Sequence, residues 1–100
     1  MNSISDDEWG LVGYIRISST RYEILKTLKS QFLMPSEIAK KNNIRTTQIS
    51  KELKNLKEQN LIECKNESAR KGRIYKITPL GLQLLEVLEN NEAARKHIIT

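Results

Sequence analysis

Apolar residues recur at helical spacing through the first half of the chain. Residues 18–32 predict an amphipathic helix whose N-cap is Ser19 or Thr20. Its apolar positions are Ile24, Leu25, Leu28 and Phe32. Residues 34–43 predict a second, shorter helix, because Pro35 suits the first helical position.

Residues 45–60 predict a third helix with two unlike faces. On a helical wheel at ~100° per residue, Ile49, Leu53 and Leu56 fall into one narrow apolar stripe. Such a stripe packs the helix against a core, so the side chains at the other positions point toward solvent. The hydroxyl, amide and cationic side chains at those other positions are Arg45, Thr46, Thr47, Gln48, Ser50, Lys51 and Lys54.

A change of period follows this helix. Residues 61–65 and 73–77 alternate between apolar and polar side chains, which is typical of half-buried strands. The stretch between them, 66–73, is polar and contains Gly72 as a turn residue. Together these residues predict an antiparallel hairpin with a basic tip or return strand.

Both ends of the chain predict helices with more apolar surface than one small domain covers. Residues 6–18 predict a helix with Asp6 as N-cap and apolar residues all round. Residues 78–96 predict a helix with Thr78 as N-cap and Pro79 in the first turn. Its apolar arc is roughly 220°, whereas a surface helix typically needs ~100°.

Pairing these two helices with those of a second copy would bury the surplus, so we expect a homodimer. The residues expected at that interface are Trp9, Leu11, Val12, Tyr14, Ile15, Leu82, Leu85 and Leu88.

At 100 residues the chain predicts one domain. The fold class is mainly α with a small β-hairpin, that is α+β. Within 1–100 we expect an N-terminal helix at 6–18, three helices and a hairpin over 19–77, and a C-terminal helix at 78–96.

Charge is unevenly distributed along the chain. Residues 45–76 carry nine Lys or Arg and four Asp or Glu, a net charge of +5, while 1–44 carry +1 and 77–100 carry −1. The whole positive excess therefore lies on the third helix and the hairpin. This segregation indicates an anionic partner that meets those elements.

Other classes of function find little support in the sequence. Cys64 is the only cysteine, so it forms no internal disulfide, and we expect a small buried hydrophobe. We find no nucleophile–base pair, paired carboxylates or phosphate-binding glycine loop, so we expect no enzyme, no cofactor and no metal. No apolar run approaches a membrane span, and "MNSISDDEW" lacks the features of a signal peptide, so we expect a cytoplasmic protein.

The order of helix, helix, short turn, helix and hairpin is the helix-turn-helix pattern followed by a wing. The span 19–88 resembles winged helix-turn-helix transcription regulators of the MarR-like and ArsR-like kind, closest to small archaeal members. The stretches that carry the resemblance are "RYEILKTL", "PSEIAKKNNI", "TTQISKELKNLKEQNLIE", "KGRIYKIT" and "PLG".

This resemblance implies that the helix at 45–60 is a recognition helix, lying in the major groove of double-stranded DNA. The wing, residues 66–73, would reach a neighbouring minor groove or the backbone. Base edges or nearby phosphates are assigned to Thr47, Gln48 and Lys51. Backbone contacts are assigned mainly to Arg45, Thr46, Ser50 and Lys54, and wing contacts to Arg70, Lys71 and Arg73.

The chain departs from the family at Arg45, where a small hydroxyl residue usually stands. Either Thr46 caps the helix one residue later, or Arg45 gives up capping for a phosphate contact. Two other functions stay open: a winged-helix module that binds protein within a larger complex, and a nonspecific chromatin-like DNA binder. The sequence indicates no operator, effector or sign of regulation.

Overall fold

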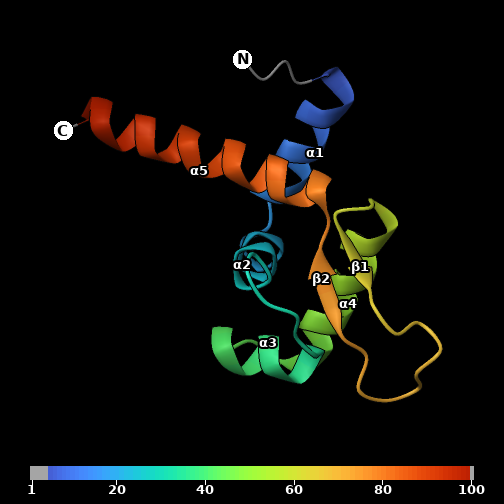
Figure 1. Cartoon of the computed structure of the whole chain (residues 1–100). Helices are drawn as coiled ribbons and strands as arrows, with labels where there is room; N and C mark the ends of the chain where they lie inside the picture. The colour runs from blue at the N-terminus through green and yellow to red at the C-terminus, as the bar shows by residue number, and fades with distance from the viewer. Residues whose placement is uncertain (1–4, 100) are drawn as a thin grey trace.

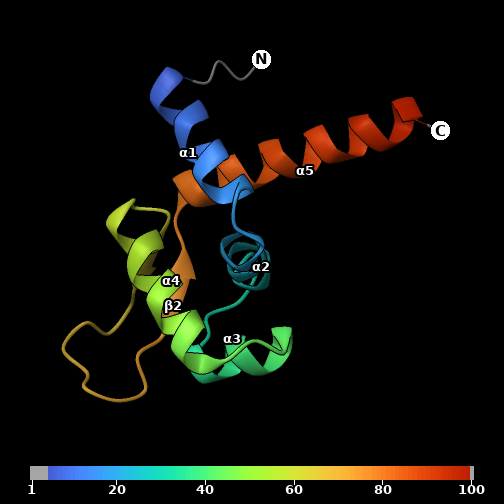
Figure 2. The same ribbon diagram turned by 180° about the vertical axis from the view of Figure 1, so that it is seen from behind.

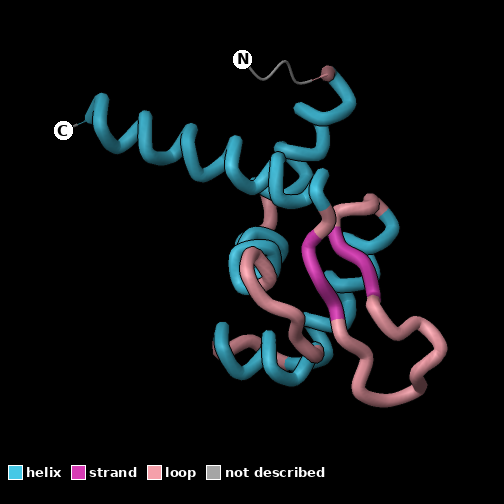
Figure 3. Tube along the Cα trace, viewed as in Figure 1, coloured by secondary structure: helices cyan, strands magenta, loops and turns pink. Residues whose placement is uncertain are grey.

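The computed structural model describes residues 5–99, with side chains described through residue 90. Five helices and a two-stranded antiparallel sheet make up this part of the chain, which confirms the predicted α+β class (Figures 1 and 3). The elements are α1 (Asp6–Arg16), α2 (Ser19–Thr27), α3 (Pro35–Asn42), α4 (Thr46–Glu58), β1 (Ile62–Cys64), β2 (Tyr75–Ile77) and α5 (Pro79–Ile99).

The elements form two ends around a central helix. At one end α1 packs across the beginning of α5; at the other lie α3, the start of α4 and the wing (Figures 1 and 2). Between them α2 contacts all four other helices. The radius of gyration is 14.0 Å, against ~13 Å for a compact domain of this length, because α5 extends past the body (Figure 1).

One apolar core joins the helices to the sheet. The predicted stripe of α4 is confirmed, since Ile49, Leu53 and Leu56 are all at most 1% exposed. The other residues exposed by less than 2% are Ile15, Ile24, Leu25, Leu28, Ile38, Leu61, Ile62, Leu84 and Leu85. Cys64 is also buried, as predicted.

The sheet is shorter than the sequence indicated and has an additional partner. The register pairs Ile62 with Ile77 and Cys64 with Tyr75, and the strands span three residues each. Leu33 adds a bridge on the other side of β2: its N–H donates to the Tyr75 carbonyl at 3.1 Å, and its carbonyl accepts the Tyr75 N–H at 2.8 Å. The segment that enters α3 is thereby tied to the hairpin.

The predicted caps of the first two helices were each misplaced. Ser5, not Asp6, caps α1, because its hydroxyl accepts from the Glu8 N–H and the Glu8 carboxylate accepts from the Ser5 N–H. Ser18, rather than Ser19 or Thr20, caps α2 through the Arg21 N–H. In both helices the capping serine lies one position before the first predicted cap. Its hydroxyl accepts the backbone N–H of the residue three positions after the serine.

The extent of two helices was also overestimated. The first helix ends at Arg16, two residues before the predicted boundary. The second ends at Thr27, and Phe32 lies beyond it with 57% of its surface exposed. The chain leaves the helical path there because Leu33 pairs with β2 instead.

The start of α5 packs closely against the turn between α4 and β1. The predicted cap is confirmed: the Thr78 hydroxyl accepts from the Gly81 N–H at 3.0 Å and donates to the Asn60 carbonyl at 2.8 Å. A Cβ at position 81 would lie 2.2 Å from the Leu61 carbonyl oxygen. Only glycine fits this approach without movement of the backbone.

Much of the surplus apolar surface of α1 and α5 is buried within the chain itself. Of the residues expected at a dimer interface, Val12, Ile15, Leu85 and Leu88 belong to the core. The others keep exposed surface: Trp9 is 48% exposed, and Leu11, Tyr14 and Leu82 are partly buried. No helix among residues 5–99 is long and apolar enough to cross a membrane.

Candidate nucleic-acid interface

The outer face of α4 is fully open to solvent. Because the core stripe fixes the rotation of the helix, the polar groups of its first turns point outward. The exposed side chains are Arg45, Thr46, Thr47, Gln48, Ser50, Lys51 and Lys54, so all the predicted contact residues of this helix lie on the surface.

The beginning of α4 excludes one of the two interpretations of Arg45, and the phosphate contact stays a prediction. Arg45 occupies the N-cap position, with extended backbone and no hydrogen bond from its side chain to the helix. Its carbonyl accepts the N–H of Ile49 at 3.0 Å. Thr46 is the first helical residue, so the alternative in which it caps the helix is excluded. The first turn therefore has no side-chain cap, and the N–H groups of an uncapped helix N-terminus favour an anion.

An open hollow of about 560 Å³ lies between α3 and the start of α4. Lys40 on α3 and Arg45 both line it. The turn between the two helices is set by Asn43, which has a left-handed backbone with φ of 54° and ends α3. Lys40 was absent from the predicted contacts, and its position only becomes apparent when α3 and α4 are placed together.

The flank of α4 that faces α2 is held by two consecutive residues of α2. The Gln48 side-chain amide donates to the Thr20 hydroxyl at 2.9 Å. One turn further along α4, the Glu52 carboxylate accepts from the Arg21 guanidinium at 2.9 Å. Neither partner on α2 was predicted from the sequence, where Thr20 was considered only as a cap.

Arg21 also binds α1, so it links three helices. Its guanidinium donates to the Tyr14 carbonyl at 2.8 Å and lies 3.8 Å from the centre of the Tyr14 ring. Burial raises the pKa of Glu52, but hydrogen bonds from Arg21 and Asn55 and the charge of Arg21 outweigh it. The pKa of Glu52 therefore lies below its ordinary value of 4.5.

The wing is tied by its own side chains. Asn66 accepts the Ile74 N–H at 2.8 Å and donates to the Gly72 carbonyl at 3.0 Å, which closes the base of the loop. The Arg73 guanidinium donates to the carbonyls of Ala69, at 2.8 Å, and Glu67, at 3.1 Å. Arg73, predicted as a DNA contact, therefore braces the loop from inside while remaining solvent-exposed.

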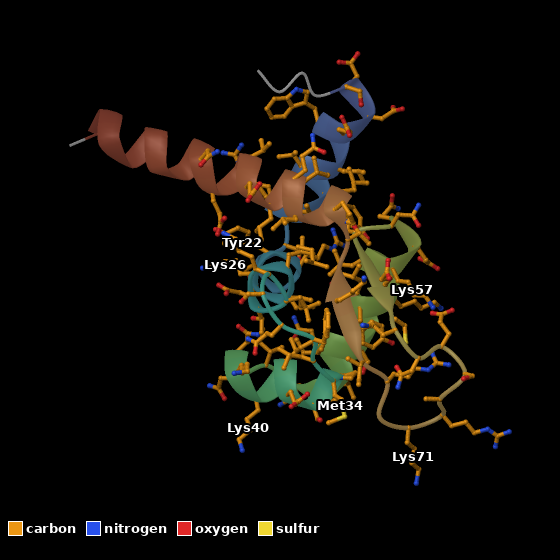
Figure 4. All side chains as sticks on the ribbon, in the orientation of Figure 1. Tyr22, Lys26, Met34, Lys40, Lys57 and Lys71 are labelled. Atoms are coloured by element: carbon orange, nitrogen blue, oxygen red, sulfur yellow. The ribbon has the colours of Figure 1, made fainter. Side chains whose placement is uncertain are left out.

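The tip of the wing carries exposed cations. Arg70 and Lys71 are exposed, and Lys71 points away from the protein at the same end as Lys40 (Figure 4). An ion pair between Lys57 and Glu67 joins the first part of the wing to the last turn of α4. The wing is thus attached to the same helix that carries the outward polar face.

Most cations of residues 45–76 have no acid bound to them. Lys57 and Lys76 pair with Glu67 and Glu63. Among the described residues no carboxylate lies within ion-pair distance of the others, which are Arg45, Lys51, Lys54, Lys65, Arg70, Lys71 and Arg73. The excess positive charge noted in the sequence is therefore unpaired on the surface at this end of the molecule.

No group of three or more His, Cys, Asp or Glu that could hold a metal occurs within residues 5–90.

This arrangement agrees with the comparisons to known proteins. The family model described as winged helix-turn-helix matches residues 18–96, and the chain belongs to that family. No curated protein sequence matches the chain. The match confirms the predicted winged helix-turn-helix fold.

Three solved structures show the same fold at low sequence identity. The MarR family transcriptional regulator SPO1453 from Silicibacter pomeroyi has a TM-score of 0.67 and 16% identity over 92% of this chain and 68% of its own. The domain Mb0332 from Mycobacterium bovis, described as a homodimeric winged helix-turn-helix DNA-binding domain of a possible ArsR-family regulator, has a TM-score of 0.69 and 24% identity, over 98% and 94%. The C30AH42A mutant of Lactococcus lactis ZitR has a TM-score of 0.66 and 23% identity over 81% of this chain. The chain spans 59% of that ZitR chain. The MarR-like and ArsR-like resemblance is confirmed, whereas the archaeal one stays a prediction.

Proposed function

We propose that this chain is a homodimeric transcription regulator that binds double-stranded DNA at specific sequences. The observation that carries the proposal is the outward face of α4, where Thr47, Lys51 and Lys54 lie opposite the buried stripe. A major groove is wide enough for one helix, and hydroxyl, amide and ammonium groups bond to base edges and phosphates.

The cations around α4 support a backbone contact on both sides of the groove. Arg45 and Lys40 line one hollow at the start of the helix, where α4 has no side-chain cap. The wing, which carries the exposed Arg70 and Lys71, lies at the same end of the protein (Figure 1). In the proposed complex the first pair meets the phosphates beside the major groove, and the wing meets the adjacent minor groove or backbone.

The long α5 supports the homodimer. It is 21 residues long and extends beyond the helices that cover its beginning (Figure 2). Trp9 and Leu82 keep apolar surface at this same end. Pairing through α1 and α5 would place two copies of α4 roughly 34 Å apart, facing successive major grooves of a palindromic site. The homodimeric description of Mb0332 agrees with this assembly.

Selection of binding sites from a random DNA pool tests specificity and symmetry together. We expect a palindrome with half-sites about one helical turn apart, and binding that weakens steeply with salt. If the protein binds DNA but enriches no sequence over the random pool, it is a nonspecific binder. A protein that binds no DNA but holds a protein partner in fixed ratio would be an interaction module.

Lys51→Ala tests the orientation of α4. We expect it to lower affinity for the selected site by ~1–3 kcal/mol, because Lys51 lies at the centre of the outward face. Lys26→Ala is the control, since it removes an equal charge from the side of α2 away from the wing (Figure 4). Equal losses in the two variants would contradict the proposed orientation. Sedimentation at micromolar concentration tests the dimer, which a monomeric result would overturn.

A further inference from the structure

The first turn of α2 reaches the edge of the face proposed to meet DNA. Thr20 is 6% exposed and is the one buried polar or charged side chain within residues 5–90. Its hydroxyl does not cap α2, because Ser18 does. The contact that it makes instead is with the Gln48 amide at 2.9 Å, across 28 positions of sequence.

The contact uses only part of the hydrogen-bonding capacity of Gln48. A glutamine amide carries two N–H groups and one carbonyl oxygen. One N–H of Gln48 is directed to Thr20. The second N–H and the carbonyl oxygen make no hydrogen bond within the described residues, and Gln48 is exposed. These two groups are the pair with which glutamine recognises N7 and the N6 amino group of adenine.

The neighbouring pair makes this support rigid. Gln48 and Glu52 are one helical turn apart on α4, and their partners Thr20 and Arg21 are adjacent on α2. Arg21 is held in turn by Tyr14 of α1. The Thr20 hydroxyl is therefore fixed relative to α4, and it orients an amide that would otherwise rotate about three side-chain bonds.

We propose that Thr20 sets base specificity without contacting DNA: it positions the Gln48 amide so that its remaining N–H and oxygen read an adenine in each half-site. This inference rests on the proposed DNA-binding function. A positioned amide loses less conformational freedom on binding than a mobile one. It also presents donor and acceptor in one order, which matches adenine and not guanine, whose O6 and N7 are both acceptors.

Thr20→Val tests the proposal, because valine keeps the shape of threonine and lacks the hydroxyl. Site selection with this variant should lower the adenine preference at one position of each half-site by about threefold to tenfold. The other positions should be unchanged. Thr20→Ser keeps the hydroxyl and should restore the preference.

A double-mutant cycle separates positioning from a purely structural role. Gln48→Ala should abolish the same adenine preference, and adding Thr20→Val to it should cause no further change in specificity. In the DNA-free protein, nitrogen relaxation of the Gln48 side-chain amide should report greater mobility in Thr20→Val than in Thr20→Ser. This last measurement does not depend on DNA binding.

The failures are distinguishable. If the native chain selects no DNA site, the proposed function fails and the inference fails with it. If the native chain selects a site and Thr20→Val selects the same one with the same base preferences, only the inference is overturned. An equal loss of affinity for every sequence, or a loss that persists in the Gln48→Ala background, would also overturn it by assigning Thr20 to stability alone.

Discussion

The two ends of the molecule are stabilised in different ways. The apolar end, made of α1 and residues 79–90, is held by side chains such as Ile15 and Leu85 that are completely buried. The basic end, made of α3, residues 45–54 and the wing, is joined to the same core by Ile38, Ile49 and Leu53, but its wing is held by local hydrogen bonds and its cations are exposed. Substitutions at the apolar end should therefore change stability first, whereas those at the basic end should change binding first.

Gly81→Ala, at the apolar end, should have the largest effect. The added Cβ would overlap the Leu61 carbonyl oxygen, which belongs to the backbone and cannot rotate away. We expect a loss of ~3 kcal/mol in the free energy of unfolding, measured by urea denaturation. Gly10→Ala is the matched control, because nothing lies within 4 Å of its added Cβ. In a helix interior it should stabilise by ~0.5–1 kcal/mol. A similar gain in both variants would show that helix propensity, not the close approach, governs position 81.

Arg21→Met tests the junction between the two ends. It removes the partner of Glu52 and a hydrogen bond to Tyr14, and should lower stability at about pH 7 by ~2 kcal/mol. Because the pKa of Glu52 is depressed in the folded protein, its contribution is present above the ordinary value of 4.5 and is lost as pH falls through the folded pKa. Without Arg21 the pKa of Glu52 is lowered less, because only the hydrogen bond from Asn55 and the charge of Lys51 then oppose the rise caused by burial.

The variant should consequently lose less stability than the native chain between about pH 5 and pH 3. Urea denaturation across this range measures the difference. Parallel curves for the two proteins would mean that Glu52 does not depend on Arg21 for its ionisation.

Replacing both Arg70 and Lys71 by alanine should change binding without changing the fold. Both side chains are exposed at the wing tip, so the free energy of unfolding should stay within ~0.5 kcal/mol. The slope of log affinity against log salt should fall by about 0.9 for each phosphate that the wing no longer neutralises. Base preferences should persist, because we propose that these cations meet the adjacent minor groove or the backbone. A changed preference would instead assign the wing to direct readout.

Asn43→Ala should have the smallest effect. Asn43 holds a left-handed backbone at the end of α3, which costs an alanine ~1 kcal/mol. Asn43→Gly should be neutral or slightly stabilising. Thermal unfolding of the two variants measures the difference, and equal melting temperatures would exclude backbone strain as the reason for asparagine at this turn.

Sequence periodicity correctly predicted features that depend on which side chains of a single helix are buried. The narrow stripe through Ile49, Leu53 and Leu56 indicated both the existence of α4 and its outward face, and the buried state of this stripe confirms that part. The cap at Thr78 was also readable, because a hydroxyl before Pro79 is a local signal.

Features that depend on two distant segments were not readable. The bridge that follows α2 pairs Leu33 with Tyr75, which lies far along the chain. Thr20 could not be connected with Gln48 until α2 and α4 were packed together. Arg73 resembled its neighbours Arg70 and Lys71 in sequence, and only the folded loop shows its guanidinium turned toward backbone carbonyls.

The bracing of the wing by Asn66 and Arg73 has a consequence for the thermodynamics of binding. Ordering a loop backbone opposes association by ~1–2 kcal/mol of conformational entropy per residue. Here the loop already has its hydrogen bonds within the isolated chain, so this entropy is lost during folding and not at the encounter. A partner that meets the wing tip therefore needs to immobilise only the long side chains of Arg70 and Lys71, and even modest contacts there can add to the affinity.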